Sequence, residues 1–253
     1  MINLNDVSLI AVATKEVEET VQAIQYSLKS VSFDRVMLFA HFNPKPMATD
    51  YEFIQIEPFS SESSIDDALN KIELLHKRAI EYTKSLLDRQ VIERIYQLIK
   101  NAKYIEIYGT GINFSLAEIY SLNFEEEGVI SKAYNSLNPM HLQYLRQRKP
   151  NDTVCIYLTH TGQNKEMLKI AKDIRKYHAK SIVICDHKKR EICKYCDETI
   201  VIMTTQNTTE LSNAVYIASL QYVFNIFTSL KLISNYSYLE ETTKAVDKFK
   251  MGE

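Results

Sequence analysis

Short apolar runs alternate with segments of helical periodicity between residues 103 and 232. Strands are predicted for the apolar runs at 104–108, 130–134, 153–158, 181–185 and 198–203. The intervening segments repeat apolar residues with helical spacing, which predicts helices that begin near Ser115 and cover 140–147, 164–177, 190–195 and 210–232. Alternating strands and helices are typical of a parallel sheet with both faces covered. We therefore predict an α/β fold, a five-stranded Rossmann-like three-layer sandwich.

Two further helices are predicted ahead of this sheet, at 64–88 and 91–101. Upstream of them the pattern indicates a small β-α-β unit, with strands at 7–13 and 35–42, a helix at 15–31 and another short strand at 51–56. A cluster of serines then predicts a linker. We expect two parts: a segment of unknown role at 1–60 and a domain at 64–240 that includes its two leading helices.

Glycine is concentrated where the predicted strands end. The chain has five glycines, and two of them, Gly109 and Gly111, directly follow the first strand of the sheet. In open parallel sheets, ligands bind beyond the carboxyl ends of the strands, where glycine allows close backbone approach. The segment Gly-Thr-Gly-Ile-Asn-Phe-Ser at 109–115 has Phe114 in place of the third glycine of a dinucleotide fingerprint, and no Gly-Lys-Ser/Thr of a P-loop follows.

A second polar loop follows the third strand and reads Thr159, His160, Thr161, Gly162, Gln163, Asn164. It leads into a predicted helix, whose N-terminal amides and dipole favour an anion such as phosphate. Ordinary turn and N-cap chemistry is the alternative explanation for either loop alone. Both loops on strands of one sheet favour a phosphate site, with Thr110 and Asn113 of the first loop as further candidate ligand contacts.

These two loops resemble those of the sugar isomerase (SIS) domain. SIS domains carry a Gly-x-Gly-x-Ser loop after the first strand and a Ser-x-Ser-Gly-x-Thr loop after the third. This chain keeps a polar side chain at each of these positions, with Asn113 and Asn164 as departures. Together with the two leading helices, the order of elements is most like the effector domain of RpiR-type transcriptional regulators. Those regulators open with a helix-turn-helix domain, whereas residues 1–60 show no such pattern.

The resemblance implies a phosphorylated sugar as ligand, and we predict a sugar-phosphate sensor without its own DNA-binding domain. The alternative is an aldose–ketose isomerase, which needs a general base. Glu210, at the start of the last predicted helix, and His160, in the second loop, are the two candidates. Each has a plainer explanation, since Glu210 also suits a helix first turn and His160 a variable loop position.

Composition and charge argue against a DNA-binding protein and a membrane protein. The net charge is −2, and residues 1–60 are net acidic, so we expect direct DNA binding by this chain alone to be absent or weak. No apolar run reaches the length of a membrane span and no signal pattern opens the chain, which predicts a cytoplasmic protein without a membrane partner. The helix at 210–232 is apolar on most sides, which predicts at least a homodimer.

The four cysteines do not follow a metal-binding pattern. Cys155 and Cys185 lie in apolar runs, where cysteine behaves as a small buried hydrophobe. Cys193 and Cys196 form a single CxxC with neither a second CxxC nor histidines at zinc-ligand spacing. We therefore predict structural cysteines, no metal and no cofactor.

Overall fold

The computed structural model describes residues 10–13, 37–40, 59–205 and 211–251. The chain divides into two compact units, Met1–Tyr51 and Glu52–Glu253. In the first unit, strands β1 (Ile10–Ala13) and β2 (Met37–Ala40) pair in parallel. The helix expected at 15–31 and the strand expected at 51–56 lie outside the described residues. The role of residues 1–60 as a separate segment stays a prediction.

The second unit contains the predicted five-stranded parallel sheet. Its strands lie in the order β4-β3-β5-β6-β7, and all four pairings are parallel. The strands are β3 (Tyr104–Tyr108), β4 (Ile130–Tyr134), β5 (Thr153–Leu158), β6 (Lys180–Cys185) and β7 (Glu198–Val201). Three of them have the predicted bounds, because each is a short apolar run between clear breaks. The central strand β5 is buried along its whole length.

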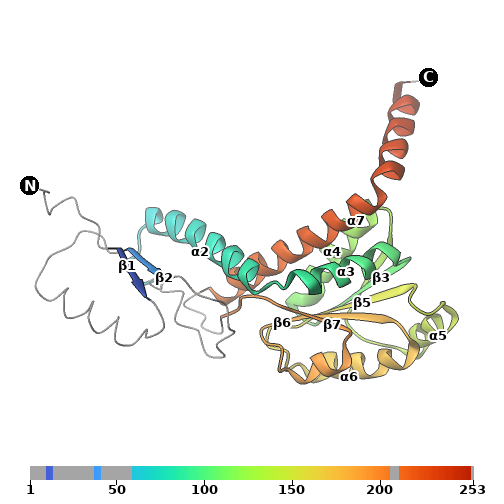
Figure 1. The fold of residues 1–253 in the computed structure, drawn as a ribbon, viewed down its shortest axis with the longest axis horizontal. Coiled ribbons are helices and arrows are strands. Elements are labelled where there is room, and N and C mark those ends of the chain that lie inside the picture. Colours follow the sequence, from blue (N-terminus) through green and yellow to red (C-terminus); the bar gives the residue numbers. More distant parts are fainter. Residues whose placement is uncertain (1–9, 14–36, 41–58, 206–210, 252–253) are drawn as a thin grey trace, which may run out of the picture. The chain divides into compact units, whose positions relative to one another are not determined.

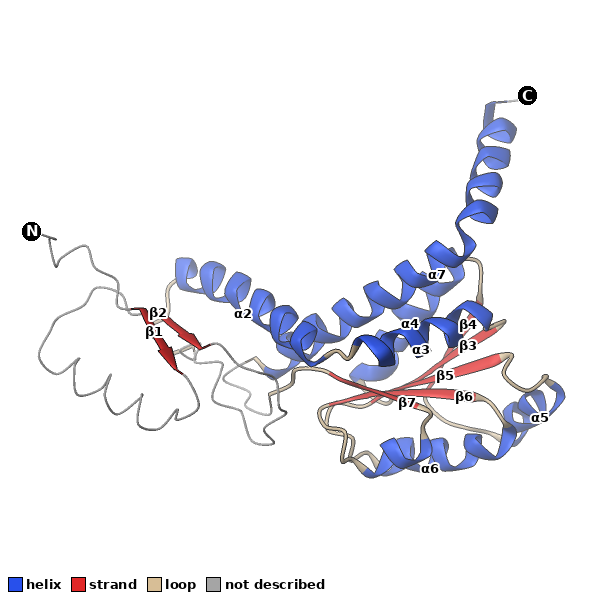
Figure 2. Ribbon diagram, in the orientation of Figure 1, coloured by secondary structure: helices blue, strands red, loops and turns tan. Residues whose placement is uncertain are grey.

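Helices cover both faces of this sheet, as predicted (Figures 1 and 2). They are α2 (Ile65–Leu86), α3 (Arg89–Asn101), α4 (Ile112–Glu126), α5 (Pro139–Gln147), α6 (Lys165–Ile174) and α7 (Ser212–Met251). Helices α3, α4 and α7 form one layer, whose core includes Ile95, Tyr120 and Phe224. Helices α5 and α6 form the other layer, which packs against the opposite face of β3, β5 and β6. Helix α2 packs against α7 around Leu75 and Ala79.

Polar side chains fix where several of these helices begin. Ser64 and Asp67 form a reciprocal capping box at the start of α2. Asp88, Asn138 and Asn164 cap α3, α5 and α6 by accepting hydrogen bonds from first-turn amides. Neighbouring residues in the sequence therefore determine where these helices begin, and their buried apolar faces determine how they pack on the sheet.

Two predicted helices differ from the structure. The segment expected to be a helix at 190–195 is a 3-10 helix, η4 (Glu191–Tyr195), because the short connection between β6 and β7 leaves no room for a longer element. The last helix does not end at residue 232 but continues to Met251. Its later part carries fewer apolar side chains than its first part but contains no glycine or proline, and an ion pair between Glu240 and Lys244 spans one turn.

Candidate functional site

The two glycine-containing loops lie at the point where the strand order of the sheet reverses. The chain starts the sheet at β3, adds β4 on one side, and then adds β5, β6 and β7 on the other. Helix α4 after β3 and helix α6 after β5 lie on opposite faces of the sheet, and in open α/β sheets ligands bind at the carboxyl ends of two such strands. The first loop follows β3 and the second follows β5, and these strands are direct neighbours. The predicted ligand residues therefore lie at the carboxyl ends of two neighbouring strands.

The first loop needs both of its glycines. The Gly109 N–H donates to the Tyr134 carbonyl oxygen at 3.0 Å, which ties the loop to the end of β4. A Cβ atom at Gly109 would lie 2.4 Å from the backbone oxygen of Asn113. Gly111 caps α4 with φ of 58°, a conformation that L residues rarely adopt. The close turn brings the backbone of Thr110 and Asn113 together, with the Asn113 N–H donating to the Thr110 carbonyl oxygen at 3.2 Å.

The second loop is held by its own hydroxyl and amide groups. Thr159 is buried, and its hydroxyl accepts a hydrogen bond from the Gly162 N–H at 3.1 Å. Gly162 has φ of 63°, and a Cβ atom there would lie 2.5 Å from Cγ of Arg190. The Asn164 Oδ1 accepts from the amides of Glu166 and Met167, the first turn of α6. The Thr159 hydroxyl therefore stabilises the turn, and the Asn164 Oδ1 caps α6, without any need for a ligand.

One hydrogen bond joins the two loops. The Asn164 Nδ2 donates to the Thr110 Oγ1 at 2.9 Å, across 54 positions of sequence. Asn164 thus uses both ends of its amide, one to cap α6 and the other to hold the first loop against it. Asparagine is a departure from the SIS pattern at this position, and this second hydrogen bond is what its amide adds. The candidate residues from both loops therefore form one continuous polar edge.

Each loop also presents a buried polar atom without a hydrogen-bond partner among the described residues. These atoms are Oδ1 of Asn113 and Nε2 of His160. The His160 ring stacks on Tyr216 of α7, with 4.5 Å between ring centroids. Burial lowers the pKa of His160, and the charge of Asp186 and a hydrogen bond with the Thr205 backbone oppose this only in part. A neutral imidazole and an amide oxygen can both accept hydrogen bonds from sugar hydroxyls.

Two candidate residues remain, Thr161 and Glu210, and only Thr161 lies among the described residues. Thr161 is half-buried in the second loop, and within the described residues its hydroxyl makes no hydrogen bond. Glu210, the other candidate base, lies outside the described residues. Sequence reasoning missed Tyr216, which supports His160, and the ion pair between Asp186 and Arg190 that packs on Gly162. The only sequence signal for that pair is an acid and a base four positions apart directly after β6.

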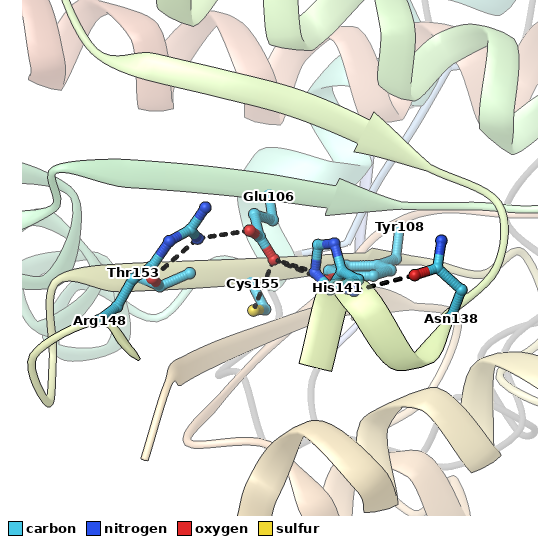
Figure 3. A network of polar contacts seen from close by, with 7 residues as sticks. All are labelled: Glu106, Tyr108, Asn138, His141, Arg148, Thr153 and Cys155. Atoms are coloured by element: carbon cyan, nitrogen blue, oxygen red, sulfur yellow. Dashed lines mark hydrogen bonds and ion pairs between the residues drawn. The ribbon is translucent and has the colours of Figure 1, made fainter. Parts of the chain in front are cut away.

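A buried polar network lies below the first loop, on the face of β3 toward α5 (Figure 3). The Glu106 carboxylate accepts from the Tyr108 hydroxyl at 2.6 Å, contacts His141 Nε2 at 3.0 Å and is paired with Arg148. Burial acts to raise the pKa of Glu106, but hydrogen bonding and charge from His141, the Tyr108 hydroxyl and Arg148 bring it below its ordinary value. Since Tyr108 directly precedes Gly109, the network fixes the strand end from which the loop departs.

Comparison with known proteins places this fold and these loops in one family. The family model described as "SIS domain" matches residues 98–227. The chain belongs to the SIS domain family. This SIS domain covers the sheet, both candidate loops and α7 as far as Phe227.

Relatives of this SIS domain include regulators. The chain is 26% identical over 186 residues to an uncharacterised HTH-type transcriptional regulator of Thermotoga maritima, covering 73% of this chain. The chain spans 62% of the length of that relative.

Solved structures share the fold at low sequence identity. The sugar isomerase domain of an RpiR transcription factor from Sphaerobacter thermophilus has a TM-score of 0.60 at 13% identity, covering 71% of this chain and 98% of that one. The Vibrio vulnificus NanR protein, complexed with ManNAc-6P, has a TM-score of 0.57 at 16% identity, covering 73% of this chain and 70% of NanR. These likenesses confirm the predicted α/β sandwich.

Membrane spans and metal sites can be searched for within the described residues. No helix in the described ranges combines the length and apolar character that a membrane span requires. No group of three or more histidine, cysteine, aspartate or glutamate side chains in those ranges could hold a metal ion.

Proposed function

We propose that this SIS domain binds a phosphorylated sugar at the carboxyl ends of β3 and β5 and acts as a sugar-phosphate sensor. The observation that carries the proposal is the Asn164–Thr110 hydrogen bond, which holds the two glycine loops together as one polar edge. The phosphate would lie against the second loop near the N-terminus of α6, where the helix dipole favours an anion. Asn113 and His160 would accept hydrogen bonds from the sugar hydroxyls.

The similar proteins support the assignment as a sugar-phosphate sensor. The NanR structure is a complex with ManNAc-6P, and the Thermotoga maritima relative is an uncharacterised HTH-type transcriptional regulator. We infer that the sensed ligand is a sugar monophosphate, and that any DNA contact comes from elements other than the SIS domain. Direct, sequence-specific DNA binding by this chain alone should be weak or absent.

A thermal-shift panel tests ligand binding directly, because a ligand that binds only the folded state raises the melting temperature. The panel contains ManNAc-6P, other hexose 6-phosphates, pentose 5-phosphates, the matching unphosphorylated sugars and inorganic phosphate. We expect at least one sugar phosphate to raise the melting temperature while its unphosphorylated counterpart does not. A chain that responds to none of the sugar phosphates does not have the proposed function.

Replacement of Thr161 by valine should weaken that binding by about 1–3 kcal/mol, because the isosteric side chain removes a hydroxyl that would face the phosphate. Calorimetry with the responding sugar phosphate measures the loss. Thr161→Ser keeps the hydroxyl and serves as the matched control, with near-normal affinity expected. Unchanged affinity in Thr161→Val would place the phosphate elsewhere.

We also propose that the protein forms a homodimer or higher homo-oligomer through α4 and α7. Large apolar side chains are exposed along these helices, among them Leu122 at 60%, Ile233 at 64% and Tyr236 at 59%. The Asn235 side chain donates to the Glu127 carbonyl oxygen, so the end of α4 lies beside this part of α7. The later part of α7 extends beyond the sheet and its covering helices (Figure 1). A second copy would offer the same apolar side chains as its complement.

Light scattering at micromolar concentration should give at least twice the mass of one chain. Leu122→Glu should lower that mass toward the monomer without unfolding the protein, because the side chain is mostly exposed in one chain. Gln143→Glu adds the same charge at an exposed position of α5. This variant is the control and should leave the mass unchanged. A monomeric parent chain would contradict the oligomer.

An isomerase remains the second candidate, favoured by one observation. His160 has a lowered pKa and an unpartnered Nε2 within the described residues, so near neutral pH the imidazole is free to accept a proton. Incubation of the sugar phosphates in D2O, followed by NMR, decides between the two functions. A sensor leaves the C1 and C2 protons in place, whereas exchange that disappears in His160→Gln would establish an isomerase.

A further inference from the structure

The loop after β6 brings together two cysteines that are eight positions apart. The Sγ atoms of Cys185 and Cys193 lie 3.7 Å apart, and both thiols are within 4 Å of the His187 carbonyl oxygen. Cys185 is buried at the end of β6, whereas Cys193 lies half-buried in η4. The pair is therefore not the CxxC of Cys193 and Cys196 that the sequence displays.

The two thiols differ in character. A hydrogen bond with the Cys185 thiol lowers the pKa of Cys193 to about 7, against the opposing effect of burial. The same hydrogen bond, followed by burial, raises the pKa of Cys185. Burial also raises the pKa of Cys196 and of Cys155. Near neutral pH, Cys193 is thus the cysteine with most thiolate, and the thiolate is the form that reacts with oxidants.

The pair is also mechanically connected to the candidate site. Between the two cysteines, Arg190 pairs with Asp186, and its aliphatic stem lies against Gly162 of the second loop. The Cys193 N–H donates to the Arg190 carbonyl oxygen at 3.1 Å. A bond between the two sulfur atoms requires a separation of about 2.05 Å, so they must approach by more than an ångström. Arg190 lies on the segment between the two cysteines, so a backbone shift that closes this gap would move its side chain against Gly162.

We propose that Cys193 and Cys185 form a dithiol that hydrogen peroxide oxidises, and that its disulfide changes the affinity of the neighbouring loop for the sugar phosphate. The Cys193 thiolate attacks one peroxide oxygen, the O–O bond breaks, and Cys193 becomes a sulfenic acid while the other oxygen leaves as water after protonation. The Cys185 sulfur then attacks the Cys193 sulfur, the S–O bond breaks, and a second water leaves. Two thiols lose two electrons in total, and one peroxide is reduced to two waters.

The first test uses the unmodified chain and hydrogen peroxide. After oxidation and alkylation, trypsin separates all four cysteines, because Cys155, Cys185, Cys193 and Cys196 fall on peptides 149–165, 181–188, 191–194 and 195–231. We expect peptide 181–188 linked to 191–194, released by dithiothreitol. A link to 195–231 instead, or only over-oxidised Cys193, would overturn the assignment.

Variants then separate the two roles. In Cys185→Ser, dimedone should trap the Cys193 sulfenic acid, because the resolving thiol is missing. In Cys193→Ser, peroxide should produce no internal disulfide, whereas Cys196→Ser, the matched control, should form it at the parental rate. The oxidation rate should rise with pH through about 7 and then level off, following the Cys193 thiolate.

The effect on affinity rests on the proposed function and has its own measurement. Calorimetry on the reduced and oxidised protein, with the sugar phosphate that stabilises the reduced form, should show at least a threefold difference in Kd. Cys193→Ser should show the same Kd before and after peroxide. A disulfide with unchanged Kd would refute the coupling and leave the redox site standing. Absence of any ligand for the reduced protein would refute the proposed function, and the peptide map would still decide the disulfide.

Discussion

Glu106→Gln should lower the free energy of unfolding by about 3–5 kcal/mol. The carboxylate is buried, with 2% of the side chain exposed, and it is paired with Arg148 and His141. The glutamine amide keeps the shape but removes the charge, so the Arg148 guanidinium loses its anionic partner inside the domain. Urea unfolding of the parent and the variant at pH 7 measures the difference.

The same residue should make stability depend on pH. The pKa of Glu106 is lowered in the folded chain, so its contribution is complete above the unfolded pKa of about 4.3 and disappears as the pH falls through the folded value. The parent should therefore lose stability in this acidic range, and Glu106→Gln should lose less. Glu93→Gln, which breaks the exposed pair with Arg89, is the control and should change stability little. Equal stability of Glu106→Gln and the parent would mean that the buried charge contributes nothing.

Gly109→Ala should cost about 3 kcal/mol of folding free energy and also abolish measurable sugar-phosphate binding. The added Cβ would lie 2.4 Å from the Asn113 carbonyl oxygen, a backbone atom that cannot move without displacing the first turn of α4. Displacement of that turn separates Thr110 from Asn164. Thermal unfolding gives the stability, and the thermal-shift panel gives the binding.

Gly128→Ala provides the matched control for this substitution. Gly128, unlike Gly109, has a positive φ, of 77°, but a Cβ there meets only ordinary contacts at 3.7 Å or more. Only backbone strain of about 1–2 kcal/mol is expected, and ligand binding should persist. If Gly109→Ala behaves like Gly128→Ala in both measurements, the close approach at Gly109 is not what shapes the loop.

Local signals in the sequence predicted the sheet and both loops. The bounds of β3 and β5 follow from short apolar runs, and the loops follow from glycines shortly after them, Gly109 directly after β3 and Gly162 four residues after the end of β5. The way these loops meet could not be predicted, because the Asn164–Thr110 hydrogen bond joins side chains 54 positions apart. An amide at a helix N-cap gives no sign in sequence of what its second polar atom contacts.

The Glu106 network was missed for a related reason. A single acidic residue inside an apolar strand normally predicts a side chain that faces solvent. The partners of Glu106, Arg148 and His141, lie 42 and 35 positions away in the sequence. Only the packing of α5 on the sheet brings these charges together. The length of α7 was missed because the prediction followed apolar periodicity, which ends where the helix leaves the core, whereas helical propensity continues.

Helix α7 has the geometry of a lever. Tyr216, near its first turn, stacks on His160 in the candidate site, and the helix continues without interruption to Met251. At 1.5 Å per residue, the helical path from Tyr216 to the far end is about 50 Å long, and the helix bends in its last part (Figure 2). A tilt of roughly 5° at the site would therefore displace that end by up to about 4 Å, so a small rearrangement of one ring can become a movement larger than a bond length at a distant surface. In an oligomer built on α7, two such arms would move against each other.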